Sequence, residues 1–166
     1  MQSNTYAGLP GLLADGPDPQ VATEMALFGR LIGHWRVVNR LRDEAGRWSS
    51  FDGTWDFAWS LGGRAVQDVL NCPSAPGRYP GTTVRCYDER EDRWYAWWLD
   101  PHSGTYVTLT ASPADDGVEL LGHTQHGVAL RWVFTDITGD SFHWSGYRSV
   151  GGGPYELVQE MAVRRG

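Results

Sequence analysis

The sequence predicts an all-β protein, an antiparallel up-and-down β-barrel of about ten strands preceded by one N-terminal helix. Three observations predict this fold class. From His34 onward, short runs with a hydrophobic period of two alternate with turn clusters about every 10–14 residues. No helical pattern lies between these runs, which excludes the crossover helices that parallel sheets need. The short connections favour a closed barrel over a sandwich, because closure removes exposed strand edges.

The N-terminal helix is predicted over residues 19–32. Asp18 can accept hydrogen bonds from the first amides of this helix, the proline after it suits the first helical position, and Gly33 ends the helix. Apolar residues recur at helical spacing, namely Val21, Met25, Phe28 and Ile32. Residues 1–18 are rich in Gly and Pro, so we expect a loosely ordered segment there and one domain over residues 19–166.

Large aromatic residues occupy alternate positions in several predicted strands, so they share one face of the sheet. Trp55 and Trp59 share a face in this way, and we assign such aromatic faces to the interior of the barrel. The strand at residues 93–99 is ambiguous, because both of its faces are bulky. The predicted strands are residues 34–42, 48–59, 64–70, 81–87, 93–99, 105–112, 118–125, 129–135, 141–149 and 155–164.

The charge of the chain excludes several function classes. The formal net charge is −6, whereas nucleic-acid binding needs clustered basic residues, so we expect no nucleic-acid partner. All fourteen basic residues are arginine. The absence of lysine excludes Schiff-base catalysis, a lysine general base and a P-loop.

Two further features concern the compartment. No apolar run reaches the roughly 18–20 residues that a membrane helix needs, and the N-terminus lacks the pattern of a secretory signal. We therefore expect a cytoplasmic protein with no membrane partner. Cys72 follows a strand in a Pro-rich loop and Cys86 lies in a strand-like run, so we expect two thiols rather than a disulfide.

The tripeptide Gly33-His34-Trp35 follows the helix and opens the first strand. In this position it resembles the Gly-x-Trp signature of the calycin superfamily, to which the lipocalins belong. The resemblance implies that Trp35 closes one end of the barrel. It also implies that an arginine of the last strand, Arg164 or Arg165, packs over the indole in a cation–π contact.

Ten strands are more similar to the fatty-acid-binding-protein and nitrobindin branches of that superfamily than to the eight-stranded lipocalins. Lipocalin-like bacterial families of unassigned function also carry runs similar to Trp55-Asp56-Phe57. The last predicted strand, however, has no histidine for the haem of nitrobindin-like barrels and no Arg-x-Tyr pair for a fatty-acid carboxylate. We therefore expect neither ligand and no cofactor.

The nine tryptophans of the chain favour a cavity with aromatic walls, and the alternative is that the indoles only fill the core. Two polar pairs, Gln67-Asp68 and Gln159-Glu160, lie on strands, so one member of each must face inward. An inward glutamine can bind a ligand carbonyl or hydroxyl. The candidate ligand-binding residues are Trp55, Trp59, Gln67, Trp94, Trp98, Trp132, Trp144 and Gln159.

Candidate catalytic residues are few. The sequence has no Gly-x-Ser-x-Gly elbow, no Walker loop and no dinucleotide-binding Gly-x-Gly-x-x-Gly. His123 is a candidate general base, and Glu160, if it faces inward, is a candidate acid–base group with a raised pKa. His123 and His126 are three residues apart on a strand and point to opposite faces, so we expect no metal site.

The sequence therefore predicts binding of a bulky apolar or aromatic small molecule in the barrel. The alternative is an enzyme that uses the cavity as a template, such as a cyclase or isomerase in the biosynthesis of polyketide-like natural products, without a metal or a covalent nucleophile. A filled barrel that serves only as an interaction module is the third reading. The expected partner is a small apolar ligand or substrate, and a homodimer is compatible with the sequence.

Overall fold

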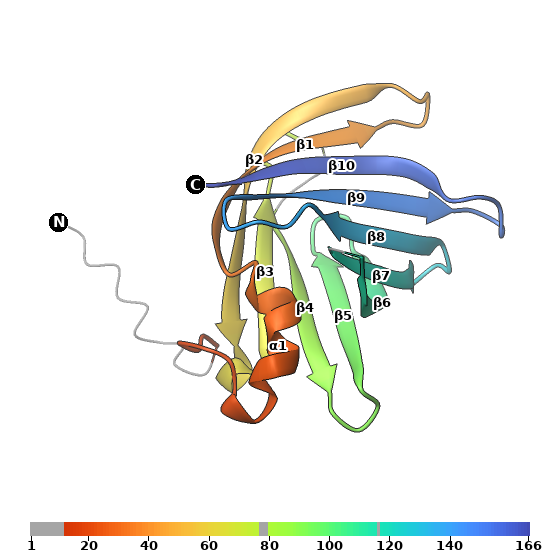
Figure 1. The fold of residues 1–166 in the computed structure, drawn as a ribbon. Coiled ribbons are helices and arrows are strands. Elements are labelled where there is room, and N and C mark those ends of the chain that lie inside the picture. Colours follow the sequence, from red (N-terminus) through yellow and green to blue (C-terminus); the bar gives the residue numbers. More distant parts are fainter. Residues whose placement is uncertain (1–11, 77–79, 116) are drawn as a thin grey trace.

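The computed structural model describes residues 12–76, 80–115 and 117–166. It is a closed antiparallel barrel with one helical segment at the N-terminal side (Figure 1). The strands are β1 (Gly33–Arg42), β2 (Trp48–Ser60), β3 (Ala65–Asn71), β4 (Gly81–Asp88), β5 (Arg93–Asp100), β6 (Thr105–Ala114), β7 (Gly117–Thr124), β8 (Ala129–Thr135), β9 (Ser141–Ser149) and β10 (Glu156–Arg165).

Each strand pairs with the next one along the chain, and the barrel closes where β1 pairs with β10. The closing register runs from Trp35 opposite Arg165 to Leu41 opposite Gln159. Figure 1 shows β1, β10 and β9 side by side at the top of the view, with the C-terminus beside the start of β1, whereas β2 runs from there down to the lower end, where it pairs with β3. The predicted fold class is confirmed, and the predicted strands agree with the observed ones within two residues at each end.

The helical segment begins as the sequence predicts and ends earlier. The Asp18 side chain accepts a hydrogen bond from the Gln20 amide at 2.9 Å, and a 3₁₀ turn (Pro19–Val21) leads into α1 (Ala22–Gly29). The expected helix to residue 32 is too long. The carbonyl oxygens of Leu31 and Ile32 instead accept hydrogen bonds from side chains of the barrel, which stops the helical pattern there.

The helix closes one end of the barrel. Met25 and Phe28 on its inner face are fully buried, and the Phe28 ring packs edge-on against Trp94 with a centroid separation of 4.9 Å. In Figure 1, α1 lies against β3 at the end where β1 starts. Burial of this apolar face, rather than the propensity of an eight-residue segment, is what holds so short a helix in place.

The contact implied by the Gly-x-Trp resemblance is present at this closed end. The Arg165 guanidinium lies 3.7 Å from the centre of the buried Trp35 ring, so Arg165 and not Arg164 makes the cation–π contact. The Trp35 indole N–H donates to the Leu31 carbonyl at 2.7 Å, and Arg165 Nη1 donates to the Ile32 carbonyl at 2.9 Å. Gly33 has a φ of 130°, and a Cβ there would overlap Arg165 Nη1, so glycine is required.

Among the described residues, no disulfide joins Cys72 to Cys86. Most of the N-terminal segment expected to be loosely ordered, residues 1–11, lies outside the described residues, whereas Leu13 forms an isolated β-bridge with Ser60. In the part of the chain that the structure describes, no helix is both long enough and apolar enough to cross a membrane.

Candidate ligand-binding cavity

A cavity of about 60 Å³ lies in the barrel toward the end opposite the helix. Residues near that end of their strands, such as Leu70 of β3 and Trp98 of β5, lie at its mouth. Opposite walls of the barrel contribute, so the cavity lies inside the sheet and not on its outer surface. Its lining residues are Trp55, Leu70, Thr83, Arg85, Trp98, Trp132, Trp144, Gln159 and Met161.

Four indole rings form most of the apolar wall. They contact one another edge to face in a continuous chain: Trp98 with Trp132 at 6.5 Å between centroids, Trp132 with Trp144 at 5.5 Å, and Trp144 with Trp55 at 6.3 Å. Trp55 and Trp144 are buried, whereas Trp98 and Trp132 are partly exposed. The wall is therefore buried at its base and reaches solvent at its rim.

The position of Trp98 depends on a glycine of the neighbouring strand. A Cβ at Gly81 would overlap the Trp98 ring, so the indole lies directly against the backbone of β4. Gly146 on β9 has the same relation to the Trp144 ring. Small residues in β4 and β9 therefore let two large rings fold back along the wall, which leaves open the space between them.

A buried ion pair joins two strands beside these rings. Arg85 Nη2 of β4 donates to Asp68 Oδ2 of β3 at 2.6 Å, and the two side chains are 1% and 0% exposed. The second Asp68 oxygen accepts the Thr83 amide at 2.9 Å. A paired and hydrogen-bonded carboxylate is the form in which an acidic side chain is tolerated in an interior. The pair holds Arg85 in one orientation within the cavity wall.

The Arg85 guanidinium also packs on aromatic rings that lie toward the closed end. Its central carbon is 5.2 Å from the centre of the Phe28 ring, 5.3 Å from Phe57 and 5.8 Å from Phe134. Trp55 in turn stacks on Phe134 at 5.7 Å. Arg85 thus separates the packed aromatic cluster beneath the helix from the cavity above it.

Several hydrogen-bond donors in this wall have no acceptor among the described residues. They are Trp55 Nε1, Arg85 Nε and Arg85 Nη1, and all three are buried. An unpaired buried donor costs free energy, so such groups are uncommon in interiors. Gln159, by contrast, is anchored, since its side-chain amide donates to Asn39 Oδ1 at 3.1 Å.

The structure brings five of the eight candidate ligand-binding residues together. Trp55, Trp98, Trp132, Trp144 and Gln159 all line the cavity. Their role in binding stays a prediction.

The other three candidates lie elsewhere. Trp94 packs on Phe28 beneath the helix. The Trp59 ring lies against Gly29 of α1, where a Cβ would overlap it. Gln67 is on the outer face of β3, where its amide donates to Thr82 Oγ1 at 3.1 Å, and Asp68 is the member of this pair that faces inward.

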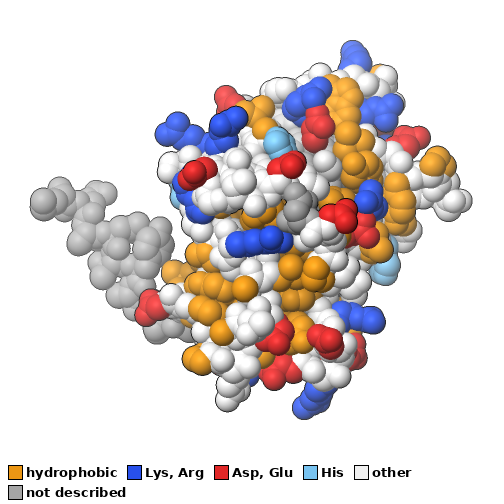
Figure 2. Space-filling view, viewed as in Figure 1, with side chains coloured by type: hydrophobic (Ala, Val, Ile, Leu, Met, Phe, Trp, Pro, Cys, Tyr) orange, Lys and Arg blue, Asp and Glu red, His pale blue; other side chains and the backbone are white. Residues whose placement is uncertain are grey.

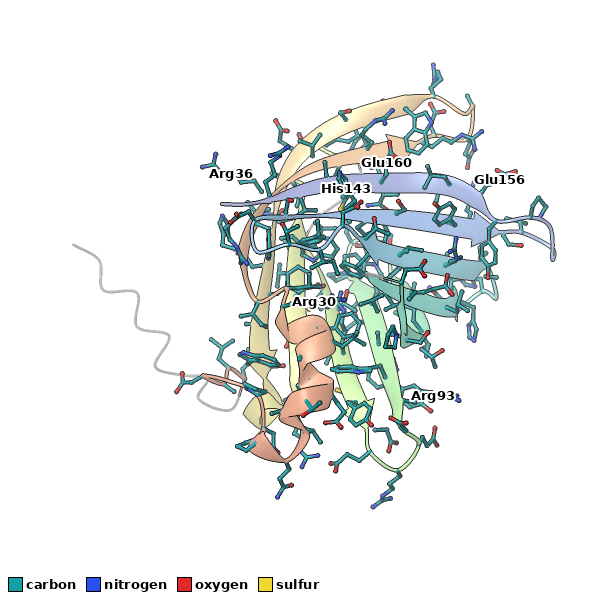
Figure 3. All side chains as sticks on the ribbon, viewed as in Figure 1. Arg30, Arg36, Arg93, His143, Glu156 and Glu160 are labelled. Carbon is teal, nitrogen blue, oxygen red and sulfur yellow. The ribbon has the colours of Figure 1, made fainter. Side chains whose placement is uncertain are left out.

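Both candidate catalytic residues lie off the cavity. His123 is on the exposed face of β7, and its ring nitrogen Nδ1 is 3.1 Å from the Thr124 carbonyl oxygen. Glu160 of β10 is paired with Arg40 on the outer face of the barrel (Figure 3). In the described part of the chain, no group of three or more His, Cys, Asp or Glu residues could hold a metal ion.

The titration of two side chains bears on nucleophilic chemistry. Burial raises the pKa of the Cys86 thiol, so this cysteine is held in its protonated, weakly nucleophilic form near neutral pH. The hydrogen bond from the Tyr87 hydroxyl to Asp92, 2.6 Å long, raises the pKa of Tyr87 to about 12. Neither residue is among those that line the cavity.

Sequence reasoning missed Arg85, the one charged residue among the described residues of the cavity wall. Its strand alternates Gly81, Thr83 and Arg85 on one face with Thr82, Val84 and Cys86 on the other. Because the face that carries Thr83 and Arg85 is polar, the sequence offered no reason to assign it to the interior of the barrel. The only signal was a pair of opposite charges, Asp68 and Arg85, on consecutive strands that a hairpin brings together.

The outer surface carries mixed charge. Figure 2 shows basic and acidic side chains interspersed on the viewed face, without a large field of one sign. Several are paired, among them Arg131 with Glu119 at 2.6 Å and Arg64 with Asp18 at 2.6 Å.

No family model matches the chain, and no curated protein matches it. Two solved structures are similar. One, the crystal structure of Rv2717c from M. tuberculosis, is 17% identical with a TM-score of 0.60, and the match covers 90% of this chain and 99% of that one. The other, the S-type phycobiliprotein lyase CPES from Guillardia theta, is 13% identical with a TM-score of 0.50 over 85% and 91% of the two chains. With the closed ten-stranded barrel and the Trp35–Arg165 contact, these matches show that the chain has the lipocalin-like fold of the calycins.

Proposed function

We propose that this barrel binds a small aromatic or apolar molecule between the tryptophan rings of its open end. The observation that carries this proposal is the cavity itself, bounded by four indoles and a few placed polar groups. Ligand sites are generally concave and mostly apolar, with a small number of polar groups that fix orientation.

The volume of the cavity limits the ligand. An engineered cavity of about 150 Å³ is enough to hold benzene, whereas this one measures about 60 Å³. Entry of an aromatic ring therefore requires a rim side chain to move. Trp98 and Trp132 are the partly exposed members of the wall, so their rings can swing toward solvent without disturbing the buried core. Binding is accordingly coupled to rotation of these two indoles.

No specific observation favours the catalytic alternative. An enzyme that uses general acid–base catalysis needs an acid or base within hydrogen-bond reach of its substrate. His123 and Glu160, the two candidates, are on the outer face of the barrel, and Glu160 forms an ion pair with Arg40. A carrier or sensor of an apolar molecule requires neither residue, so binding is the function that these positions support.

The test follows the indole N–H signals of the protein by NMR while toluene or indole is added. Signals of Trp98 and Trp132 are expected to shift with saturation, whereas that of Trp97, which is 41% exposed on the outer face of β5, stays in place. Leu70→Trp fills the mouth of the cavity and is expected to abolish these shifts. The matched control Val69→Trp adds the same side chain on the outer face, at a position 41% exposed, and should leave binding intact.

Two results would overturn the proposal. One is a titration in which neither toluene nor indole, each added up to the limit of its own solubility, shifts the Trp98 and Trp132 signals. The other is equal binding by the Leu70→Trp and Val69→Trp variants, which would place the ligand outside the barrel.

A further inference from the structure

From the unpaired donors of the cavity wall we infer that the ligand of this site carries an uncharged oxygen acceptor, such as a ketone, quinone, lactone or amide carbonyl, on its aromatic or apolar body. The inference rests on the proposed binding function and narrows the class of ligand. It concerns three buried atoms: Trp55 Nε1, Arg85 Nε and Arg85 Nη1.

The first step is the imbalance between donors and acceptors. Trp55 and Arg85 both line the cavity, and their unpaired atoms are N–H groups that can only donate. An apolar wall with unpaired N–H donors fits a ligand that has a hydrogen-bond acceptor and no N–H or O–H group that itself needs a partner. A purely hydrocarbon ligand would leave these N–H groups buried and unpaired, at the full cost of their desolvation.

The second step is the charge of the wall. Arg85 is the only charged residue among the described residues that line the cavity, and Asp68 already neutralises it at 2.6 Å. A carboxylate ligand would therefore bring a net negative charge into the interior with no second cation to offset it. Burial of an uncompensated charge is costly. A neutral carbonyl accepts the same hydrogen bonds and leaves the interior neutral.

The third step is that the donors are fixed in place. The ion pair with Asp68, itself held by the Thr83 amide, prevents the guanidinium from turning toward other acceptors. The rings of Phe28, Phe57 and Phe134 support it from the side of the closed end. Asp68 is thus a positioning residue, and the N–H groups of Arg85 and Trp55, which are buried in the unliganded barrel, contact the ligand oxygen once the rim indoles have moved.

Three probes of similar size separate these contributions on the unmodified protein: ethylbenzene has no acceptor, acetophenone has one neutral oxygen, and benzoate carries a charge. Calorimetric titration at pH 7 is expected to give a dissociation constant for acetophenone about tenfold lower than for either of the others. In parallel, the ¹⁵N–¹H signals of Arg85 Nε and Trp55 Nε1 should shift with acetophenone and not with ethylbenzene.

Two pairs of variants sharpen the test. Trp55→Phe removes a donor and is expected to reduce the advantage of acetophenone over ethylbenzene about threefold. Trp144→Phe removes a similar volume from the same wall without removing one of the three unpaired donors, so the ratio should stay unchanged. Asp68→Asn leaves Arg85 unneutralised and should raise the affinity for benzoate relative to acetophenone, whereas Glu160→Gln on the outer face should change neither affinity.

The outcomes distinguish the inference from the function on which it rests. If none of the three probes binds, the binding function is wrong. If all three bind with equal affinity, or benzoate binds best to the unmodified protein, the cavity binds ligands but the acceptor inference is wrong. Equal affinities would mean that water satisfies the three donors. The wild-type affinities and the two NMR signals decide this even if a variant fails to fold.

Discussion

Two neighbouring regions of the barrel, the closed end and the base of the cavity, use the same pair of side-chain types, a tryptophan and an arginine, in different ways. At the closed end Trp35 lies under Arg165, and its indole N–H donates to the Leu31 carbonyl. Directly opposite Trp35 in the β1–β2 register is Trp55, which lines the cavity together with Arg85. Trp55 Nε1 and two Arg85 nitrogens have no acceptor among the described residues.

The difference shows what each region is built to do. At the closed end the segment after the helix supplies the backbone carbonyls of Leu31 and Ile32 as acceptors, so Trp35 Nε1 and Arg165 Nη1 are paired within the chain. At the base of the cavity no such backbone carbonyls lie within reach of Trp55 Nε1, Arg85 Nε and Arg85 Nη1 among the described residues. Three substitutions, taken in order of expected effect, test this contrast.

Trp35→Ala is expected to have the largest effect on stability. It removes a fully buried ring, the hydrogen bond to Leu31 and the surface on which Arg165 packs, and truncations of this kind cost about 3–5 kcal/mol. Denaturant unfolding at neutral pH measures the loss. The control Trp97→Ala removes an indole that is 41% exposed and should cost less than about 1 kcal/mol. A similar loss for both variants would contradict the assigned role of the closed end.

Breaking the ion pair between Asp68 and Arg85 should cause the second-largest loss of unfolding free energy. Asp68→Leu leaves Arg85 charged and unpaired in the interior, which is expected to cost about 3 kcal/mol of unfolding free energy. The double variant Asp68→Leu/Arg85→Met replaces both charges with apolar groups and should recover most of that loss. Glu160→Leu breaks the partly exposed pair with Arg40 and should change stability by less than about 1 kcal/mol. If the double variant is no more stable than Asp68→Leu, the loss does not come from the unpaired charge.

Gly81→Ala is expected to have the smallest effect, because it acts at the open rim. A Cβ at this position overlaps the Trp98 ring, and the ring can move toward solvent, so the cost should be about 1 kcal/mol, at the lower end for overpacking. The displaced indole should show a red-shifted fluorescence emission. Gly139→Ala, where a Cβ meets nothing within 4 Å, should change neither stability nor emission. A loss of several kcal/mol in Gly81→Ala would mean that the rim is as rigid as the closed end.

Much of the fold could be predicted from the sequence because its determinants are local. Hydrophobic period two located all ten strands, and the cap at Asp18 located the start of the helix. The resemblance carried by Gly33-His34-Trp35 predicted that Arg164 or Arg165 packs on Trp35, and Arg165 makes this contact. The end of the helix was placed too late, since the carbonyls that stop it are used by side chains distant in sequence.

The candidate site was predictable only in part. On most strands the large rings alternate with smaller residues, so their inward face could be assigned, although the strand at residues 93–99 was ambiguous. Four of the six candidate tryptophans line the cavity. The polar groups could not be assigned in the same way. One face of β3 carries Val66, Asp68 and Leu70, and the other carries Gln67 and Val69. Because both faces combine apolar and polar residues, strand alternation alone does not decide which face points into the barrel.

The sequence by itself thus determined the class of fold, its strands, the cap of its helix and the aromatic character of its interior. These follow from periodicity and near-neighbour hydrogen bonds, which a single strand or turn already contains. Only the tertiary structure decided that Arg85 and Asp68 face inward and that Gln67, His123 and Glu160 do not. It also decided that three donors of the cavity wall have no acceptor among the described residues. Pairing of a buried polar group depends on what the opposite wall of the closed barrel presents to it, and no local pattern carries that information.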